Sequence, residues 1–272
     1  MTDHLATARP ALGHPEAIVR PNEAQQAFQV ERSMPSPSLA PFVDYYWLVR
    51  WNVLEPHLQQ VVGQPRVHVA AETGRLVVHG VSREPFFRTL TGTGHVLGAA
   101  FHPGGFRPLL RRSVGGISGT VSAAADLLDV DDRAAAARIL GSRDGAEMVA
   151  ALEEYLLRTD PQPDPVGRRI AELVDLADHR VDITRAELLA DEAGMSLRSL
   201  QRLFTEYVGI GPKWVIQRFR ILGAVAAAHA GTPTDWAALA AELGFTDQAH
   251  LTRVFTQVVG TPPATYEREV RS

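Results

Sequence analysis

The sequence contains no cysteine, and this absence removes several kinds of chemistry at once. Disulfide bonds, zinc sites with cysteine ligands and catalysis by a thiol all need a residue that the chain lacks. Lysine is almost as scarce, since Lys213 is the only lysine among 27 basic residues. No run of about 18 apolar residues occurs, so the sequence predicts no membrane-spanning helix. The first residues lack the apolar core of a secretory signal, and we therefore expect a cytoplasmic protein.

Apart from these absences, the composition is that of an ordinary folded protein. The chain has 272 residues, of which 45% are hydrophobic and 21% are charged. This length suffices for two domains, each with its own core. The formal net charge is −4, and residues 164–272 also carry more acidic than basic side chains. Such a charge balance predicts weak non-specific affinity for any nucleic acid.

The most informative feature that is present is a degenerate repeat near the C-terminus, with its two copies about fifty residues apart. The copies are LADEAGMSLRSLQRLFTEYVGIGP at 189–212 and LAAELGFTDQAHLTRVFTQVVGTPP at 239–263. Each has a short helix rich in Ala and Leu, a glycine turn, a Ser or Thr N-cap and a second amphipathic helix. One such hairpin is a weak signal, because any capped helical hairpin resembles it. Two copies that both end in Gly-x-x-Pro predict a protein that reads DNA.

Composition divides the chain into four segments. Residues 1–33 show no clear periodicity and are expected to form a loose arm, followed by a β-rich sensor domain over 34–158. The segment TDPQPDP at 159–165 is interpreted as a linker, because its prolines interrupt both helices and strands. Residues 166–272 have helical periodicity throughout and are expected to form the DNA-binding domain.

Short apolar runs separated by Gly, Pro and Asn favour a small antiparallel sheet or barrel in the N-terminal domain. The runs expected as strands are Tyr45–Val49, Leu58–Val62, Val67–Ala70, Leu76–Val81 and His95–Phe101. Residues 122–158 then have apolar side chains at helical intervals, and these helices either cover the sheet or form a dimer interface.

Two further features of this domain could belong to a ligand site. Five histidines, at positions 57, 68, 79, 95 and 102, have no metal-binding spacing, and we interpret them as structural residues with separate hydrogen bonds. The glycine pair in FHPGGF at 101–106 is interpreted either as a pocket edge or as a tight connection that packs Phe106 and Leu109.

The C-terminal domain is expected to hold seven helices. Their predicted bounds are 166–178, 185–193, 197–208, 212–228, 233–242, 247–259 and 262–270. A capping box of Thr184 with Glu187 opens the second helix, whereas Ser196 caps the third and Thr246 the sixth. The helices 197–208 and 247–259 are the predicted recognition helices.

Each recognition helix has an apolar face and an outward polar face. Arginine and glutamine on such a face can each form two hydrogen bonds with the edge of one base. The outward residues are Arg198, Gln201, Arg202 and Thr205 in the first helix, and Gln248, Ala249, Thr252 and Arg253 in the second. The faces differ, so we expect the two units to read different half-sites within one asymmetric DNA site.

Local charge and spacing support this interpretation. Residues 196–220 contain Arg198, Arg202, Lys213, Arg218 and Arg220 against Glu206 alone. The helix between the two units, at 212–228, is roughly 25 Å long and, with the units themselves, places the recognition helices on the order of 34 Å apart. That separation is one turn of B-DNA, so both helices would enter successive major grooves.

The segment 236–266, WAALAAELGFTDQAHLTRVFTQVVGTPPATY, closely resembles the C-terminal signature of AraC/XylS-type transcriptional regulators. The resemblance covers roughly 166–270 and implies a seven-helix domain with two helix-turn-helix motifs. Carried over by position, it places Arg198, Gln201 and Arg202 at the bases of one groove. It also places Gln248, Ala249, His250 and Arg253 at the other groove. The chain departs from the family at Leu251, in place of the commoner Phe, and at Thr256, in place of a Lys that would contact phosphate.

Residues 34–120 resemble, more loosely, an uncharacterised N-terminal domain of some actinobacterial regulators of this type. The residues that carry the resemblance are Pro41–Trp47 and the run GAAFHPGGFRPLL at 98–110. The resemblance implies a small cupin-like β-barrel that senses a small molecule or mediates dimerisation.

The sequence therefore predicts an α+β protein that regulates transcription by binding specific double-stranded DNA. Its other expected partners are RNA polymerase, a small-molecule effector and a second copy of the chain. No catalytic residue, cofactor or metal is expected. Two alternatives stay open: a cupin-type metal-dependent enzyme with a DNA-binding appendage, and a protein that binds other proteins because its acidic balance repels DNA. A cysteine-dependent alkylation-repair fusion is excluded by composition.

Overall fold

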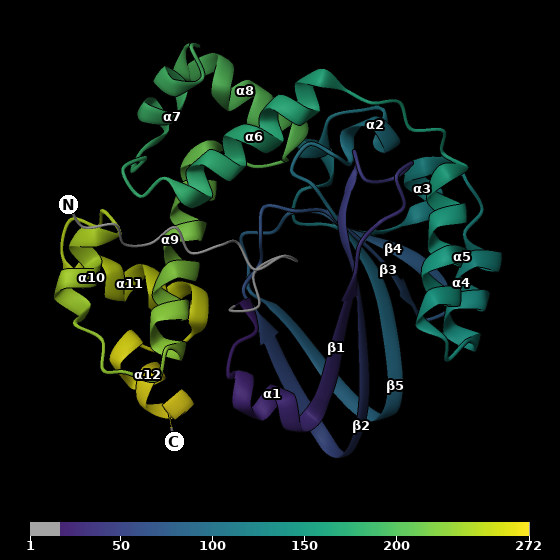
Figure 1. Cartoon of the computed structure of the whole chain (residues 1–272), viewed down its shortest axis with the longest axis horizontal. Coiled ribbons are helices and arrows are strands. Elements are labelled where there is room, and N and C mark those ends of the chain that lie inside the picture. The colour runs from purple at the N-terminus through teal and green to yellow at the C-terminus, as the bar shows by residue number, and fades with distance from the viewer. Residues whose placement is uncertain (1–16, 272) are drawn as a thin grey trace.

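A computed structural model describes residues 17–271, which form a sheet-based N-terminal part and a helical C-terminal part (Figure 1). In the N-terminal part, the strands are β1 (Phe28–Ser33), β2 (Val43–Val61), β3 (His68–Glu72), β4 (Arg75–His79), β5 (Phe86–Phe101) and β6 (Val121–Ala123). The helices of this part are α1 (Pro21–Ala27), α2 (Arg107–Leu110), the 3-10 helix η2 (Val114–Ile117), α3 (Ala124–Leu128), α4 (Arg133–Gly141) and α5 (Gly145–Leu157). No helix within 17–271 is long and apolar enough to cross a membrane.

The six strands form one antiparallel sheet in the order β1-β2-β5-β3-β4-β6. The expectation of a barrel is wrong, because the sheet is open, with β1 and β6 as its edges. Two of the predicted strands also prove to be one, since β2 runs from Val43 to Val61. Its register with β5 shifts between Val53 and His57. Pro56 lies in this irregularity, where the ladder does not require its missing N–H.

Helices α3, α4 and α5 lie beside the sheet, and α4 packs on β3, β4 and β5 (Figure 1). The apolar stripe predicted over 122–158 is buried there, as Ile139, Met148 and Leu152 show. The segment is helical from Ala124 onward, whereas residues 122 and 123 belong to β6, and most of its apolar side chains belong to the core of the monomer.

The expected loose arm differs from the observed structure. Residues 1–16 lie outside the described part of the chain, but α1 and β1 already occupy positions 21–33. Strand β1 pairs with β2 along its whole length, from Phe28 opposite Trp51 to Ser33 opposite Tyr46. The alternating pattern that identifies a strand is weak here because an edge strand keeps much of its surface in water.

The C-terminal part has the seven predicted helices. They are α6 (Pro165–His179), α7 (Ala186–Glu192), α8 (Leu197–Tyr207), α9 (Pro212–His229), α10 (Trp236–Glu242), α11 (Gln248–Val259) and α12 (Pro263–Arg271). Helix α9 connects the first unit, α6 to α8, with the second unit, α10 to α12 (Figure 1).

The predicted helix caps are only partly correct. Ser196 caps α8 by accepting the Ser199 N–H, as expected. Helix α11 is capped by Asp247 instead of Thr246, and α10 begins after Asp235 instead of at 233. In both cases a carboxylate supplies the cap, and a charged acceptor binds a backbone N–H more strongly than a hydroxyl. The capping box at Thr184 is absent, since α7 begins at Ala186 without a side-chain cap.

The FHPGGF turn is a site of close backbone packing between the two parts of the molecule. A Cβ on Gly105 would lie 2.3 Å from the Phe42 carbonyl oxygen, and one on Gly104 would lie 2.7 Å from the Gly167 carbonyl oxygen on α6. Phe106 and Leu109 are buried beside the turn. Of the two interpretations, the tight connection is therefore the one observed, and it joins the sheet domain to the helical domain.

Candidate nucleic-acid interface

Helix α8 separates its residues into a buried and an exposed face. Leu200 and Phe204 have no exposed surface, and they anchor the helix to the core of the first unit. Arg198, Gln201 and Arg202 lie on the other face and are exposed. The predicted reading side chains of α8 are therefore on the surface.

Helix α11 repeats this arrangement in the second unit. Leu251 and Phe255 are fully buried, and Phe255 contacts the rings of Trp236 and Tyr266. The exposed residues on the other face are Gln248, Ala249 and Arg253. Two surface helices that follow a glycine turn thus present equivalent polar faces, although their side chains differ.

Two residues predicted at the DNA surface on α11 are half-buried. His250 donates its backbone N–H to the Asp247 cap, and its Nδ1 lies 3.3 Å from the Thr246 hydroxyl. Its ring also meets the Phe245 ring edge-on, with the centroids 5.3 Å apart. The carbonyl of Thr252 accepts a hydrogen bond from the Thr256 hydroxyl. His250 therefore stabilises the start of α11, and a contact with DNA remains a prediction for both residues.

Thr205, the fourth predicted reading residue on α8, is exposed but lies beside the N-terminal part. Its hydroxyl donates to the Gln201 carbonyl. A Cβ on Gly115 of η2 would lie 2.9 Å from the Thr205 methyl group and 3.0 Å from its carbonyl oxygen. The end of α8 is thus in direct contact with η2, a contact that sequence reasoning did not anticipate.

The basic charge around the two units is distributed differently from the expectation. Arg198, Arg202, Lys213 and Arg253 are exposed, and none forms an ion pair with another residue of 17–271. Arg218, in contrast, is buried over the Trp214 ring and donates to the Arg83 carbonyl. Burial lowers the pKa of Arg218 to about 10, which still leaves the group charged at neutral pH. Two of the five predicted cations, Arg218 and Arg220, thus serve internal contacts.

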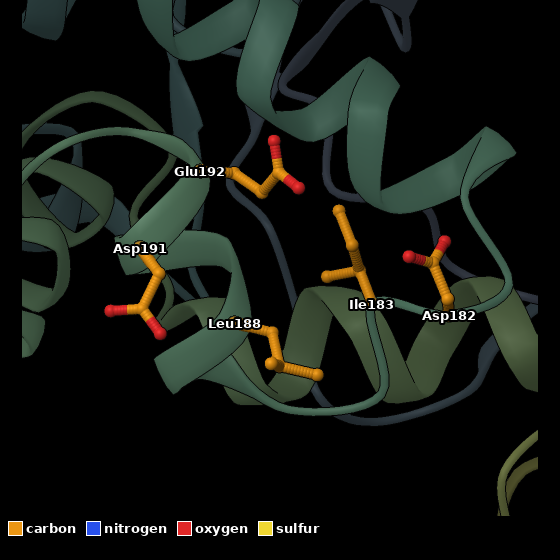
Figure 2. Close-up of a pocket in the computed structure, with 5 residues that line it drawn as sticks. All are labelled: Asp182, Ile183, Leu188, Asp191 and Glu192. Carbon is orange, nitrogen blue, oxygen red and sulfur yellow. The ribbon is translucent and has the colours of Figure 1, made fainter.

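A surface hollow of about 490 Å³ lies next to α7 in the first unit (Figure 2). Its lining residues are Asp182, Ile183, Leu188, Asp191 and Glu192. Arg180 pairs with two of these carboxylates and holds the pKa of Asp182 below its usual value. The lining of the hollow is mainly acidic, which disfavours contact with phosphates there.

The N-terminal part contacts both helix-turn-helix units. At α8, Arg107 forms an ion pair with Glu206 at 2.9 Å, and the Ser118 hydroxyl donates to the Gly209 carbonyl. At the second unit, Gln60 donates to the carbonyl of Val258, the penultimate residue of α11. The segment at α1 reaches α12, where Arg20 pairs with Glu269 at 3.0 Å. The two parts of the molecule are therefore joined at several separate points.

The five histidines of the N-terminal part do not form one cluster, although His68 and His79 are opposite each other on β3 and β4. His68 accepts a hydrogen bond from the Trp47 indole at 3.2 Å, and burial lowers its pKa to about 3, so the ring is neutral. His79 contacts Glu72, and His95 contacts the Ile139 carbonyl. Within the described residues, no group of three or more His, Asp or Glu side chains is placed to hold a metal ion.

Comparison with known proteins agrees with this architecture. Residues 189–269 match the family described as "Helix-turn-helix domain", and residues 31–122 match the "Domain of unknown function (DUF6597)". The chain is 28% identical over 220 residues to the transcriptional activator NphR of Rhodococcus sp. The aligned segment covers 79% of this chain and 57% of that protein. The chain thus spans a little over half the length of this curated relative.

Solved structures of ToxT from Vibrio cholerae are also similar to the chain, at 12% identity. One, in the P21 crystal form, has a TM-score of 0.40 and covers 90% of this chain and 100% of that chain. Another, from strain O395, has a TM-score of 0.41 and covers 90% of this chain and 98% of that chain.

The matched segment 189–269 includes both recognition helices together with their glycine turns, so the C-terminal part is a double helix-turn-helix DNA-binding domain. This domain is of the AraC type. The helix-turn-helix domain of this chain thus matches the one that the sequence signature of AraC/XylS-type transcriptional regulators predicted.

Proposed function

We propose that the chain regulates transcription by binding one asymmetric DNA site with both of its helix-turn-helix units. In this proposal α8 and α11 enter successive major grooves on one side of the duplex. The base-reading side chains are Arg198, Gln201 and Arg202 on α8, with Gln248 and Arg253 on α11. The proposal includes no catalytic step.

The observation that carries this proposal is the pair of exposed faces on two equivalent surface helices. Arginine can donate two hydrogen bonds to guanine, and glutamine can bond adenine in the same way. The three arginines on these faces form no ion pair within 17–271, so no internal bond must break before they meet DNA. Helix α9, with 18 residues, is roughly 27 Å long, and this length together with the width of the flanking units supports a separation of about one turn of B-DNA.

The experiment is a selection of bound duplexes from a random DNA library by the full chain, followed by footprinting of the selected site. We expect one asymmetric site of roughly 15–20 base pairs whose protected stretches lie about one helical turn apart. Its affinity should fall as salt rises, with a small slope, because few cations face the DNA. Equal affinity for selected and scrambled duplexes would contradict the proposal.

We also propose that the N-terminal part modulates this binding, through a small-molecule effector or through dimerisation. Support comes from the contact between η2 and the end of α8, which covers part of the reading helix near Thr205. A state of the N-terminal part that loosens this contact would free the first unit. We further propose RNA polymerase as a partner of the DNA-bound protein.

Two neighbouring glycines of η2 allow a matched test of this modulation. A Cβ on Gly115 would meet Thr205, whereas a Cβ on Gly116 would have no atom within 4 Å. Gly115→Ala should therefore push η2 from α8 and raise the affinity for the selected DNA several-fold, with Gly116→Ala close to the wild type. Equal affinities for all three proteins, measured by fluorescence anisotropy, would contradict a restraining role of this contact.

A further inference from the structure

One side chain at the middle of the helical domain holds backbone from both helix-turn-helix units. Arg220 projects from α9 and is half-buried. Its Nη1 donates to the Leu243 carbonyl, and its Nη2 donates to the Ile183 carbonyl at 2.6 Å. Ile183 precedes α7 in the first unit, whereas Leu243 follows α10 in the second. A single guanidinium thus connects the two units by hydrogen bonds, in addition to their covalent connection through α9.

The two carbonyls belong to segments that position the reading helices. Leu243 and Gly244 form the turn between α10 and α11, so a shift of this turn moves the start of α11. Ile183 is buried in the loop before α7, which packs on α8. The guanidinium is planar, and its donors keep a fixed angle to one another, so the two carbonyls are held in a fixed mutual geometry.

A second contact supports the same bridge. Gly244 has a φ of +67°, and a Cβ there would lie 2.5 Å from the Thr184 methyl group and 2.7 Å from Arg220 Nη1. The turn of the second unit therefore lies directly against the loop of the first, beside the guanidinium. The equivalent turn residue of the first unit, Gly194, has a φ of +66° and no atom within 4 Å of such a Cβ.

We infer that Arg220 is a positioning residue that sets the spacing and rotation between the two reading helices, and so the half-site separation that the protein accepts. This inference rests on the proposed binding of both units to one duplex. Helix α9 fixes the distance between the units along its axis. The orientation of the α10–α11 hairpin around that axis depends on side-chain contacts. Arg220 supplies such a contact to both units at once.

The test uses the full chain and the duplex selected by the wild type, together with versions in which one base pair is inserted or removed between the half-sites. Each such change shifts a half-site by about 3.4 Å and rotates it by about 34°. The wild type should lose affinity on both altered duplexes. Arg220→Gln should bind the selected duplex more weakly, and its preference for that duplex over the altered ones should fall about tenfold.

Two further variants separate positioning from charge and folding. Lys213→Gln removes an exposed cation from the same helix and should keep the spacing preference of the wild type. Arg220→Lys keeps the charge, but an ammonium group lacks the planar fork that fits two carbonyls, so it should lose part of the preference. This variant also provides a measurement if Arg220→Gln does not fold, as judged by circular dichroism.

The outcomes distinguish a failure of this inference from a failure of the proposed function on which it rests. Equal weakening of Arg220→Gln and Arg220→Lys on all three duplexes, with an unchanged preference, would overturn the positioning role while leaving sequence-specific binding intact. A wild type without preference between selected and scrambled DNA would instead refute the proposed function.

Discussion

The two helix-turn-helix units share one plan, but their reading helices have different neighbours. The end of α8 lies against η2 and carries the Arg107–Glu206 ion pair, so the first unit is connected to the sheet domain through its own reading helix. In the second unit, the sheet domain contacts the last turn of α11 at Val258, and the segment at α1 contacts α12. In the proposed function, a change in the sheet domain would therefore act on DNA through the first unit.

The turns that precede the reading helices also differ, and here it is the second unit that has the closer neighbours. Gly194 and Gly244 have nearly the same backbone conformation, with φ at +66° and +67°. Gly194 faces open space, whereas Gly244 lies against Thr184 and Arg220. The second unit is thus fixed to the first at its turn, and the first unit is fixed to the sheet domain at its reading helix.

The largest expected effect concerns the cores that the two units have in common. Phe204 and Phe255 occupy equivalent positions and are both fully buried. Replacing either with Ala should lower the free energy of unfolding by about 3–5 kcal/mol, because a large cavity is left in a packed core. Denaturant titration monitored by circular dichroism measures this loss. A cost below about 1 kcal/mol at one site only would show that the two units are not equivalent.

The plan of each unit was accessible from sequence because it depends on local patterns. The buried stripe of α8 follows from the three- and four-residue spacing of Leu200, Phe204 and their neighbours, and the turn follows from a single glycine. The family signature in 236–266 fixed the second unit in the same way. These features are encoded within about twenty residues, so no knowledge of the rest of the fold was needed.

The contacts between units were not accessible, because they join residues that are distant in the chain. Arg218 and Arg220 are close in sequence to arginines and a lysine that are exposed. No local pattern identifies them as donors to the Arg83 and Ile183 carbonyls. The same limit applies to the sheet. Whether β1 and β6 meet to close a barrel depends on strand twist and curvature, which the hydrophobic pattern does not specify.

The next effect concerns the bases that each unit reads. Arg202→Ala and Arg253→Ala should each cost about 1–3 kcal/mol of binding free energy and relax the base preference at one position. The two positions should lie in opposite half-sites. Repeating the selection from random DNA with each variant locates them, and Arg169→Ala, an exposed arginine on α6, serves as the control. Uniform weakening on all sequences would show that these arginines contact phosphate only.

The contrast between the two turns can be measured with a matched pair of substitutions. Gly194→Ala forces an L-residue into the left-handed region and should cost about 1–2 kcal/mol of stability. Gly244→Ala carries the same backbone cost and adds a clash with Thr184, so it should be the more destabilising of the two. Thermal unfolding of both variants checks the order. Equal losses would mean that the turn of the second unit is not pressed against the first.

The smallest expected effect tests the connection of the first unit to the sheet domain. Arg107 and Glu206 are about one-third exposed, at 29% and 34%, so solvent screening should reduce their coupling to about 0.2–1 kcal/mol in a double-mutant cycle with Ala. Amide hydrogen exchange reports this connection more directly than the small coupling energy does. Amide hydrogen exchange near the end of α8 should accelerate in Arg107→Ala, because that end loses a contact, while exchange in α11 stays unchanged. Faster exchange in α11 as well would show that the two units loosen together and that the sheet domain does not act on them separately.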